Sequence, residues 1–186
     1  MIRILAVAVA LVCAAPAFAQ TNAPVKLPAG ADPQNTVLID TTKGRIVIKL
    51  RNDLAPKHAE RIKRLTREGF YNNVPFHRVI PGFMAQTGDG QNGDGSGGSK
   101  YGTVPAEFSQ VPFTRGVVGM ARRGDSINSA NSQFFIMYGD TPSLNGQYTV
   151  VGQVISGMDV VEKIKKGEPV QDPDRIVKMQ VAADAK

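Results

Sequence analysis

The chain has 186 residues, of which 42% are hydrophobic and 20% charged, as is usual for one soluble globular domain with a sizeable core. Its nineteen glycines and twelve prolines indicate many turns, which favours a strand-rich fold over a helical bundle. The formal charge is +6, but lysines and arginines are scattered and no nucleic-acid-binding motif accompanies them, so we expect no nucleic-acid partner.

The first nineteen residues have the pattern of a signal peptide. Arg3 gives a positive start, residues 4–15 form an apolar run, and Ala17-Phe18-Ala19 supplies the small-x-small pattern of a cleavage site. The run is shorter than the about 20 residues that a membrane span needs, so we expect no span. Cleavage after Ala19 predicts a periplasmic protein that begins at Gln20.

Cys13 raises the alternative of a lipoprotein. Val12 precedes it, whereas lipid-attachment sites normally carry a small residue there, so the cleaved signal is favoured. Cleavage would remove the only cysteine, and the mature protein would then have neither a disulfide nor thiol chemistry.

Three segments are expected after the signal. Residues 20–35 are polar, rich in alanine and interrupted by prolines, which predicts a flexible lead-in. Residues 36–182 are predicted to form one domain, and residues 183–186 a short tail.

The elements of the domain are predicted from apolar spacing. Apolar residues alternate on both sides of Thr42-Lys43-Gly44, which predicts a hairpin. Pro56 suits the first turn of a helix that ends at Gly69, and a second short helix is expected to end near Gly167. Further strands are predicted at residues 116–121, 133–137, 149–155 and 176–182. This pattern predicts a mainly β fold, a closed antiparallel barrel whose ends are capped by the two short helices.

Residues 88–98 form a glycine-rich segment that matches several motifs in part. Its Gly-x-Gly-x-x-Gly spacing is that of a dinucleotide site, but no helix former follows for several residues, as such a site requires. Asp89 and Asp94 lack the repeated ligand spacing of a calcium loop. We interpret the segment as a long turn-rich loop.

Residues 76–89 contain the residues best suited to chemistry. Pro81-Gly82 predicts a turn, before which Arg78 and Ile80 share one strand face and after which Met84 and Gln86 share another. The turn can therefore bring a guanidinium beside an apolar surface and a primary amide. The segment holds no Ser/His/Asp group and no cluster of metal ligands, so it is better suited to gripping a peptide backbone than to attacking one.

Two stretches resemble the signatures of a known family. Residues 76–86, Phe-His-Arg-Val-Ile-Pro-Gly-Phe-Met-Ala-Gln, resemble the signature of the cyclophilin-type peptidyl-prolyl cis/trans isomerases, and residues 132–136, Ser-Gln-Phe-Phe-Ile, resemble the second one. The resemblance extends over residues 36–182. It implies an eight-stranded closed barrel with two capping helices, and isomerisation of X–Pro bonds.

That reaction needs neither a nucleophile nor a metal. Amide resonance sets the barrier, which is about 18–20 kcal/mol. A catalyst therefore needs an apolar pocket for the proline ring and a donor that favours the twisted amide. We accordingly expect no cofactor and no metal.

The resemblance also implies which residues form the site. Arg78 matches the catalytic arginine of the family. The implied substrate-binding positions are Phe83, Met84, Gln86, Ala121, Arg122, Gln133, Phe135, Leu144 and Tyr148. Ala121 would present backbone groups to the residue before proline. Arg122 and Tyr148 depart from the asparagine and histidine of the best-known members.

A further departure is Ser143, where those members carry a tryptophan that helps to bind the inhibitor cyclosporin. The resemblance therefore implies ordinary isomerase activity with weak inhibition by cyclosporin.

These residues predict a monomeric peptidyl-prolyl isomerase that acts on proline-containing, unfolded or extended polypeptides and assists the folding of exported proteins. Two alternatives stay open. One is a peptide-binding chaperone without catalytic activity, and the other is a nucleic-acid-associated protein, whose affinity would fall steeply with salt.

Overall fold

The computed structural model of the protein describes residues 27–185. The predicted signal peptide, residues 1–19, and the first part of the predicted lead-in lie outside the described residues. The end of that lead-in forms a 3-10 helix, η1 (Pro33–Asn35), capped by the Asp32 side chain. It packs beside a second one, η3 (Ala182–Asp184), so the ordered chain extends beyond both ends of the predicted domain.

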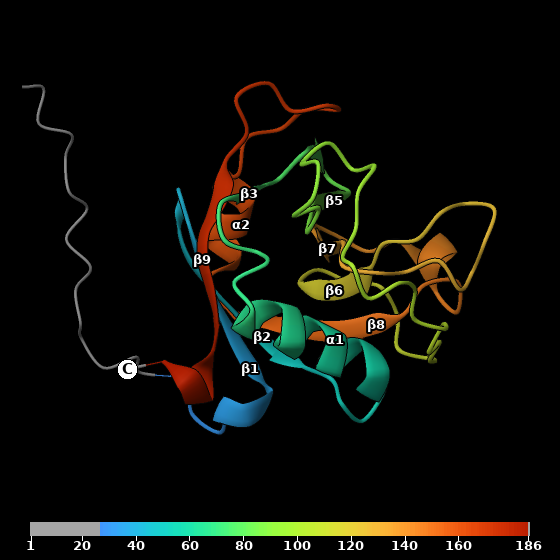
Figure 1. Ribbon diagram of the computed structural model, residues 1–186, viewed down its shortest axis with the longest axis horizontal. Helices are drawn as coiled ribbons and strands as arrows, with labels where there is room; N and C mark the ends of the chain where they lie inside the picture. The colour runs from blue at the N-terminus through green and yellow to red at the C-terminus, as the bar shows by residue number, and fades with distance from the viewer. Residues whose placement is uncertain (1–26, 186) are drawn as a thin grey trace, which may run out of the picture.

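The domain is built on a single antiparallel sheet. Its nine strands are β1 (Thr36–Thr41), β2 (Gly44–Leu50), β3 (Val74–Pro75), β4 (Arg78–Ile80), β5 (Met84–Thr87), β6 (Val117–Met120), β7 (Phe134–Met137), β8 (Val150–Ser156) and β9 (Arg175–Val181). They pair in the order β3-β9-β1-β2-β8-β6-β7-β5-β4. The sheet curls on itself, so that β9 and β5 stand on opposite sides of the core (Figure 1). The mainly β, antiparallel prediction is confirmed.

The prediction of a closed eight-stranded barrel is wrong in two respects: residues 27–185 form nine strands, and the edge strands β3 and β4 do not pair with each other. β3 ends at Pro75, which has no backbone N–H to continue a ladder. The loop of residues 167–174, which precedes β9, fills the gap between β3 and β4 instead. Gly167 and Val79 exchange two backbone hydrogen bonds of 2.8 Å, and the Val170 N–H donates to the His77 carbonyl at 3.0 Å.

The hairpin predicted at residues 42–44 is the β1–β2 connection. The Thr41 hydroxyl accepts a hydrogen bond from the Lys43 N–H and donates to the Gly44 carbonyl, at 3.0 and 2.8 Å. Gly44 has a φ of 130°, which side-chain-bearing residues rarely adopt. The tight turn therefore depends on Gly44, the residue from which the turn was predicted.

Two α-helices cover the sheet: α1 (Pro56–Arg67), against β8 and β9, and α2 (Met158–Lys163), against β2. Proline opens α1, as predicted, but the exposed N–H groups of its first turn are capped from a distant loop. The Glu107 carboxylate accepts hydrogen bonds from the backbone N–H groups of Lys57 and His58, each at 3.1 Å. No helix among residues 27–185 is long and apolar enough to cross a membrane.

Strands β5 to β8 bury side chains on both faces. The inner cluster faces the helices and the rest of the sheet, and these strands give it Ala85, Val118, Met120, Phe134, Ile136, Val151 and Val154. The outer cluster is smaller, and its buried members are Met84, Phe113, Val117, Phe135, Met137 and Val150. Successive residues along β5, β6 and β7 alternate between the two clusters, because strand side chains point to opposite faces, whereas β8 departs from this alternation at Val154. A surface cavity lies on the outer cluster.

Candidate active site

The outer cluster ends in an open cavity of about 110 Å³, called here the site cavity. It is lined by Arg78, Phe83, Met84, Gln86, Ala121, Arg122, Phe135, Leu144 and Tyr148. The fold thus brings together nine of the ten site residues predicted from the sequence. They come from β4, β5, β7 and the segments that follow β6 and surround η2 (Pro142–Leu144).

The tenth predicted residue, Gln133, lies next door. It lines a second cavity of about 420 Å³, called here the polar cavity. The two cavities share Gln86, Ala121 and Arg122 as a common wall. The polar cavity is further bordered by glycine and serine residues of the 88–98 segment, so the two hollows lie side by side.

The turn at residues 81–82 sets the edge of the site cavity that carries Arg78. Strands β4 and β5 pair antiparallel, with Arg78 opposite Gln86 and Ile80 opposite Met84. Gly82 has a φ of 72° in this turn, and the Phe83 N–H donates to the Ile80 carbonyl at 3.1 Å. The predicted meeting of a guanidinium, an amide and an apolar surface is therefore a consequence of this register.

A chain of side-chain amides orients the polar groups. An Nη1 N–H of Arg78 points to the Gln86 Oε1 at 3.5 Å, the outer limit of a hydrogen bond, and the Gln86 Nε2 donates to the Gln133 Oε1 at 2.9 Å. The Gln133 Nε2 in turn donates to the backbone carbonyls of Gly95 and Gly97, both at 2.8 Å. Each amide is held at both ends, so neither is free to rotate away from the groove.

The 88–98 loop is organised by Asp89, a buried carboxylate. Its oxygens accept backbone hydrogen bonds from Asn92, Gly95 and Gly97, each at 2.9 Å. Burial raises the pKa of this carboxyl, but the backbone donors together outweigh that effect and lower the pKa to about 2. The loop is therefore built around an internal anion and holds the carbonyls that orient Gln133. No group of three potential metal ligands occurs among residues 27–185.

Aromatic rings form the apolar floor. Phe113 stacks on Phe135 with ring centres 5.8 Å apart, and Tyr148 meets the Phe135 ring edge-on at 5.8 Å. Gly119 lies beneath the stack, where an added Cβ would come within 2.4 Å of Phe135 and 2.6 Å of Phe113. The floor can only occupy this position because residue 119 has no side chain.

Arg122 and Tyr148 close one wall together. The Arg122 guanidinium lies 4.4 Å from the centre of the Tyr148 ring, within the range of a cation–π contact. The Arg122 Nε also donates to the Gln147 carbonyl at 3.1 Å. Both residues that depart from the best-known members therefore line the cavity, and they contact each other.

Among residues 27–185, no group donates to the Ala121 carbonyl, whereas the Ala121 N–H is already paired. Its N–H donates to the Gln133 carbonyl at 2.9 Å. Its own carbonyl is thus the group that can receive an N–H from a peptide in the groove. Ser143 is exposed on η2 at the rim, beside Leu144, which lines the cavity.

Three contributing residues were missed from the sequence. Phe113 lies in an irregular segment without periodicity, so nothing placed it under Phe135. Gly119 had a signal, because a glycine inside an apolar strand often marks a close approach. No sequence signal indicated Glu168, because its carboxylate contacts Arg78 from a loop ninety residues away in the chain.

Comparisons with known proteins agree with this geometry. Residues 36–181 match the family described as cyclophilin type peptidyl-prolyl cis-trans isomerase/CLD. A probable peptidyl-prolyl cis-trans isomerase of Brucella suis is 56% identical over 177 residues, covering 87% of this chain and 90% of the relative. A peptidyl-prolyl cis-trans isomerase-like 1 protein of Aspergillus fumigatus is 42% identical over 132 residues, covering 69% of this chain and 80% of the relative.

Solved structures show the same fold. A cyclophilin from Hirschia baltica superimposes with a TM-score of 0.77 at 30% identity, covering 84% of this chain and 77% of the other. A cyclophilin-type isomerase from Cryptosporidium parvum, crystallised in the presence of the dipeptide Ala-Pro, gives a TM-score of 0.73 at 32% identity, covering 78% and 98%.

Proposed function

The chain belongs to the cyclophilin-type peptidyl-prolyl cis-trans isomerase family, and from this premise we propose that it acts as a monomer on unfolded or extended polypeptides and assists the folding of exported proteins. The observation that carries the proposal is the meeting of Arg78 with the apolar floor of the site cavity, beside the larger polar cavity.

The reaction is rotation about the C–N bond before proline. Its barrier arises from the loss of amide resonance as the bond twists. In the twisted state the proline nitrogen regains its lone pair, and a donor that favours this state lowers the barrier. No bond is made or broken, so the proposed mechanism needs no cofactor.

Arg78 is the donor in this mechanism. Its guanidinium offers several N–H donors in a fixed planar arrangement and stands at the edge of the site cavity. We assign it the contact with the prolyl carbonyl, which supports pyramidalisation of the proline nitrogen. Such fixed donors stabilise a transition state because they need no reorganisation as the charge distribution changes.

The remaining residues hold the substrate. The apolar surface of Phe83, Met84, Phe135 and Leu144 takes the proline ring. The Ala121 carbonyl receives the backbone of the preceding residue, and Gln86 orients the peptide. With one side of the bond held in the cavity, the carbonyl on the other side can swing.

The polar cavity supports the choice of extended polypeptides as substrates. It continues the groove beyond Ala121 and Arg122, with a volume of about 420 Å³ against about 110 Å³ for the site cavity. Residues next to the X–Pro pair would lie there, and only an extended chain could reach both hollows.

A prolyl-peptide assay tests the function. The isomerisation rate of an X–Pro peptide is measured by NMR exchange with and without the protein, and the refolding of a proline-limited protein is followed in parallel. We expect catalysis of both. Binding of the peptide without acceleration would instead support the alternative, a non-catalytic peptide-binding chaperone.

Export is proposed from the pattern of residues 1–19. The periplasmic fraction of a bacterium that expresses the full chain is purified, and its N-terminus is determined by mass spectrometry. A product that begins at Gln20 supports export with cleavage after Ala19. A product that still carries Cys13, with or without lipid, would overturn it.

A further inference from the structure

Glu168 reaches the catalytic arginine from a loop that has no part in either cavity. Its Oε1 accepts a hydrogen bond from the Arg78 Nε at 2.5 Å. We propose that Glu168 is a positioning residue for catalysis, which holds the Arg78 guanidinium by its Nε and so directs the remaining N–H groups into the site cavity. This inference rests on the proposed role of Arg78.

The loop that carries Glu168 is fastened on both sides of Arg78. Gly167, directly before Glu168, exchanges two hydrogen bonds of 2.8 Å with Val79. The Val170 N–H donates to the His77 carbonyl at 3.0 Å. The loop is the segment that arches between α2 and β9 at the top of Figure 1. The carboxylate is thus anchored to the two chain neighbours of the residue that it contacts.

The hydrogen-bonding capacity of Arg78 fits this role. A guanidinium has five N–H donors. Within the part of the chain that the structure describes, one goes to Glu168 and one points to Gln86. The three others remain for a substrate. Without Glu168, the one side-chain acceptor left for the guanidinium among residues 27–185 would be Gln86, at 3.5 Å.

The flexibility of arginine makes such a support necessary. A long side chain has many rotamers, and each moves the guanidinium by a large distance relative to the substrate. Arg78 is partly exposed, so packing does not select one rotamer by itself. Two acceptors at different nitrogen atoms do select one, because they fix both the position and the plane of the group. A catalytic donor works best when its orientation is set before the substrate binds.

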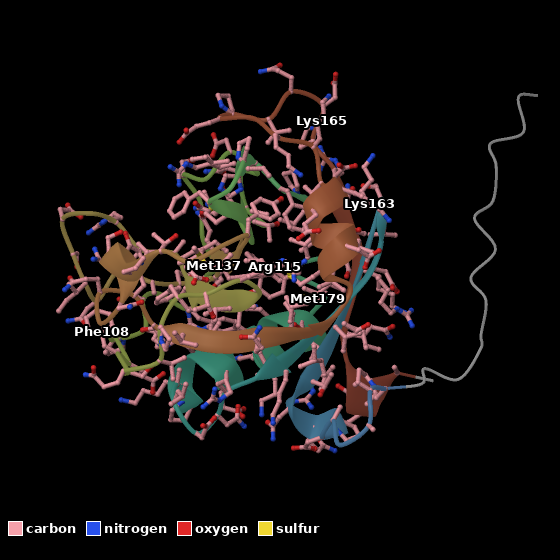
Figure 2. All side chains as sticks on the ribbon, turned by 180° about the vertical axis from the view of Figure 1, so that it is seen from behind. Phe108, Arg115, Met137, Lys163, Lys165 and Met179 are labelled. Carbon is pink, nitrogen blue, oxygen red and sulfur yellow. The ribbon has the colours of Figure 1, made fainter. Side chains whose placement is uncertain are left out.

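A pair of this kind at a surface normally contributes little to stability. The Arg115–Glu162 pair shows the contrast within the same protein. It has the same shortest distance, 2.5 Å, and similar exposure, but it lies outside both cavities. Arg115 is labelled in Figure 2, which shows the molecule from the side opposite to that of Figure 1. It therefore serves as a matched control.

The test compares kcat and KM for Glu168→Ala, Glu168→Gln and the control Glu162→Ala. We expect kcat to fall about fivefold in Glu168→Ala while KM stays within about twofold, since the pair is exposed and acts on the twisted state. Glu168→Gln keeps an oxygen acceptor for the Nε–H, so it should recover part of kcat. Glu162→Ala should match the wild type.

A double-mutant cycle separates positioning from a structural role. In the Arg78→Ala background, Glu168→Ala should cause no further loss of kcat, because there is no guanidinium left to position. An NMR spectrum of the arginine Nε–H groups gives a readout that does not depend on activity. The Arg78 signal, assigned with Arg78→Lys, should be exchange-protected in the wild type and in Glu162→Ala, and unprotected in Glu168→Ala.

The outcomes distinguish this inference from the proposed function. An inactive wild type would overturn the function, whereas the NMR result would still report on the pair. An active wild type with an unchanged kcat in Glu168→Ala would overturn the positioning role. The positioning role would also be overturned if Glu168→Ala lowered kcat by the same factor in the wild type and in the Arg78→Ala background.

Discussion

The two faces of strands β5 to β8 bury similar side chains, but one face forms the closed core and the other borders the site cavity. On the inner face, Phe134 and Ile136 are almost completely buried among residues of the whole sheet and both helices. On the outer face, their neighbour Phe135 is also buried, but it is covered by irregular segments and borders a cavity. One residue step along the same strand thus separates the core from the site.

The difference shows how one sheet can provide both a closed core and a binding surface. The inner face is closed by regular elements, which hold the strand backbones in place. The outer face is only partly covered, so its apolar side chains are available to a proline ring. We therefore expect substitutions on the inner face to lower the free energy of unfolding, and substitutions on the outer face to lower activity.

The largest effect is expected from Phe134→Ala on the inner face. Truncating a buried phenylalanine removes its packing and leaves a cavity, at a cost of about 3–5 kcal/mol in the free energy of unfolding. Urea denaturation measures this loss. Phe83→Ala, at a half-buried position of the outer face, is the comparison: it should lose much less stability and instead raise KM. Equal stability losses would contradict the distinction between the faces.

Arg78→Ala should lower activity strongly and leave stability almost unchanged, the reverse of Phe134→Ala. Loss of a fixed donor to the twisted amide should lower kcat/KM by about 100-fold, a typical value for such a donor. The free energy of unfolding should change by less than about 1 kcal/mol, because the lost ion pair is at the surface. Arg115→Ala controls for the loss of an exposed, paired arginine. A folded Arg78→Ala variant with a near wild-type rate would disprove the catalytic assignment.

Gly119→Ala tests whether the outer face tolerates additional volume. The new methyl group would collide with the Phe113 and Phe135 rings, at 2.6 and 2.4 Å. Overpacking of this kind typically costs about 1–3 kcal/mol, and the displaced rings should narrow the site cavity and raise KM. Gly124→Ala is the control, since an added Cβ there meets nothing within 4 Å. Substrate titrations and thermal melts would show whether both effects occur together.

Asp89 links the loop to the groove through a charge. Its folded-state pKa of about 2 lies below the value of 3.8 expected when unfolded, so the carboxylate form stabilises the fold. This contribution, about 2 kcal/mol, is complete above about pH 4 and is lost as the pH falls through about 2. Unfolding measured between pH 5 and pH 2 should therefore show a smaller loss of stability for Asp89→Asn than for the wild type. Parallel pH profiles would contradict the assignment.

The smallest effect on the protein itself is expected from Ser143→Trp at the exposed rim. An added indole supplies an apolar wall and an N–H donor. It should tighten inhibition by cyclosporin about tenfold or more, while kcat/KM and stability change little, because the proline-binding surface does not include this position. Inhibition is titrated at low enzyme concentration. Tight inhibition of the unmodified protein would show that the rim does not depend on tryptophan.

The sequence determined the local elements and the composition of the site. The β1–β2 hairpin followed from alternating apolar residues and a glycine, and α1 from a proline followed by apolar positions at helical spacing. Short-range periodicity is sufficient for such predictions, because they depend on neighbours in the chain. The family resemblance then identified the residues that line the site cavity.

Only the tertiary structure decided how the sheet closes and what supports the site. Pro75 ends β3, and the 167–174 loop takes the place of strand pairing at the gap. The contacts of Arg78 with Glu168 and of Phe135 with Phe113 join segments that are far apart in the chain. Local patterns carry no information on such pairs, because the geometry of the whole curled sheet brings them together.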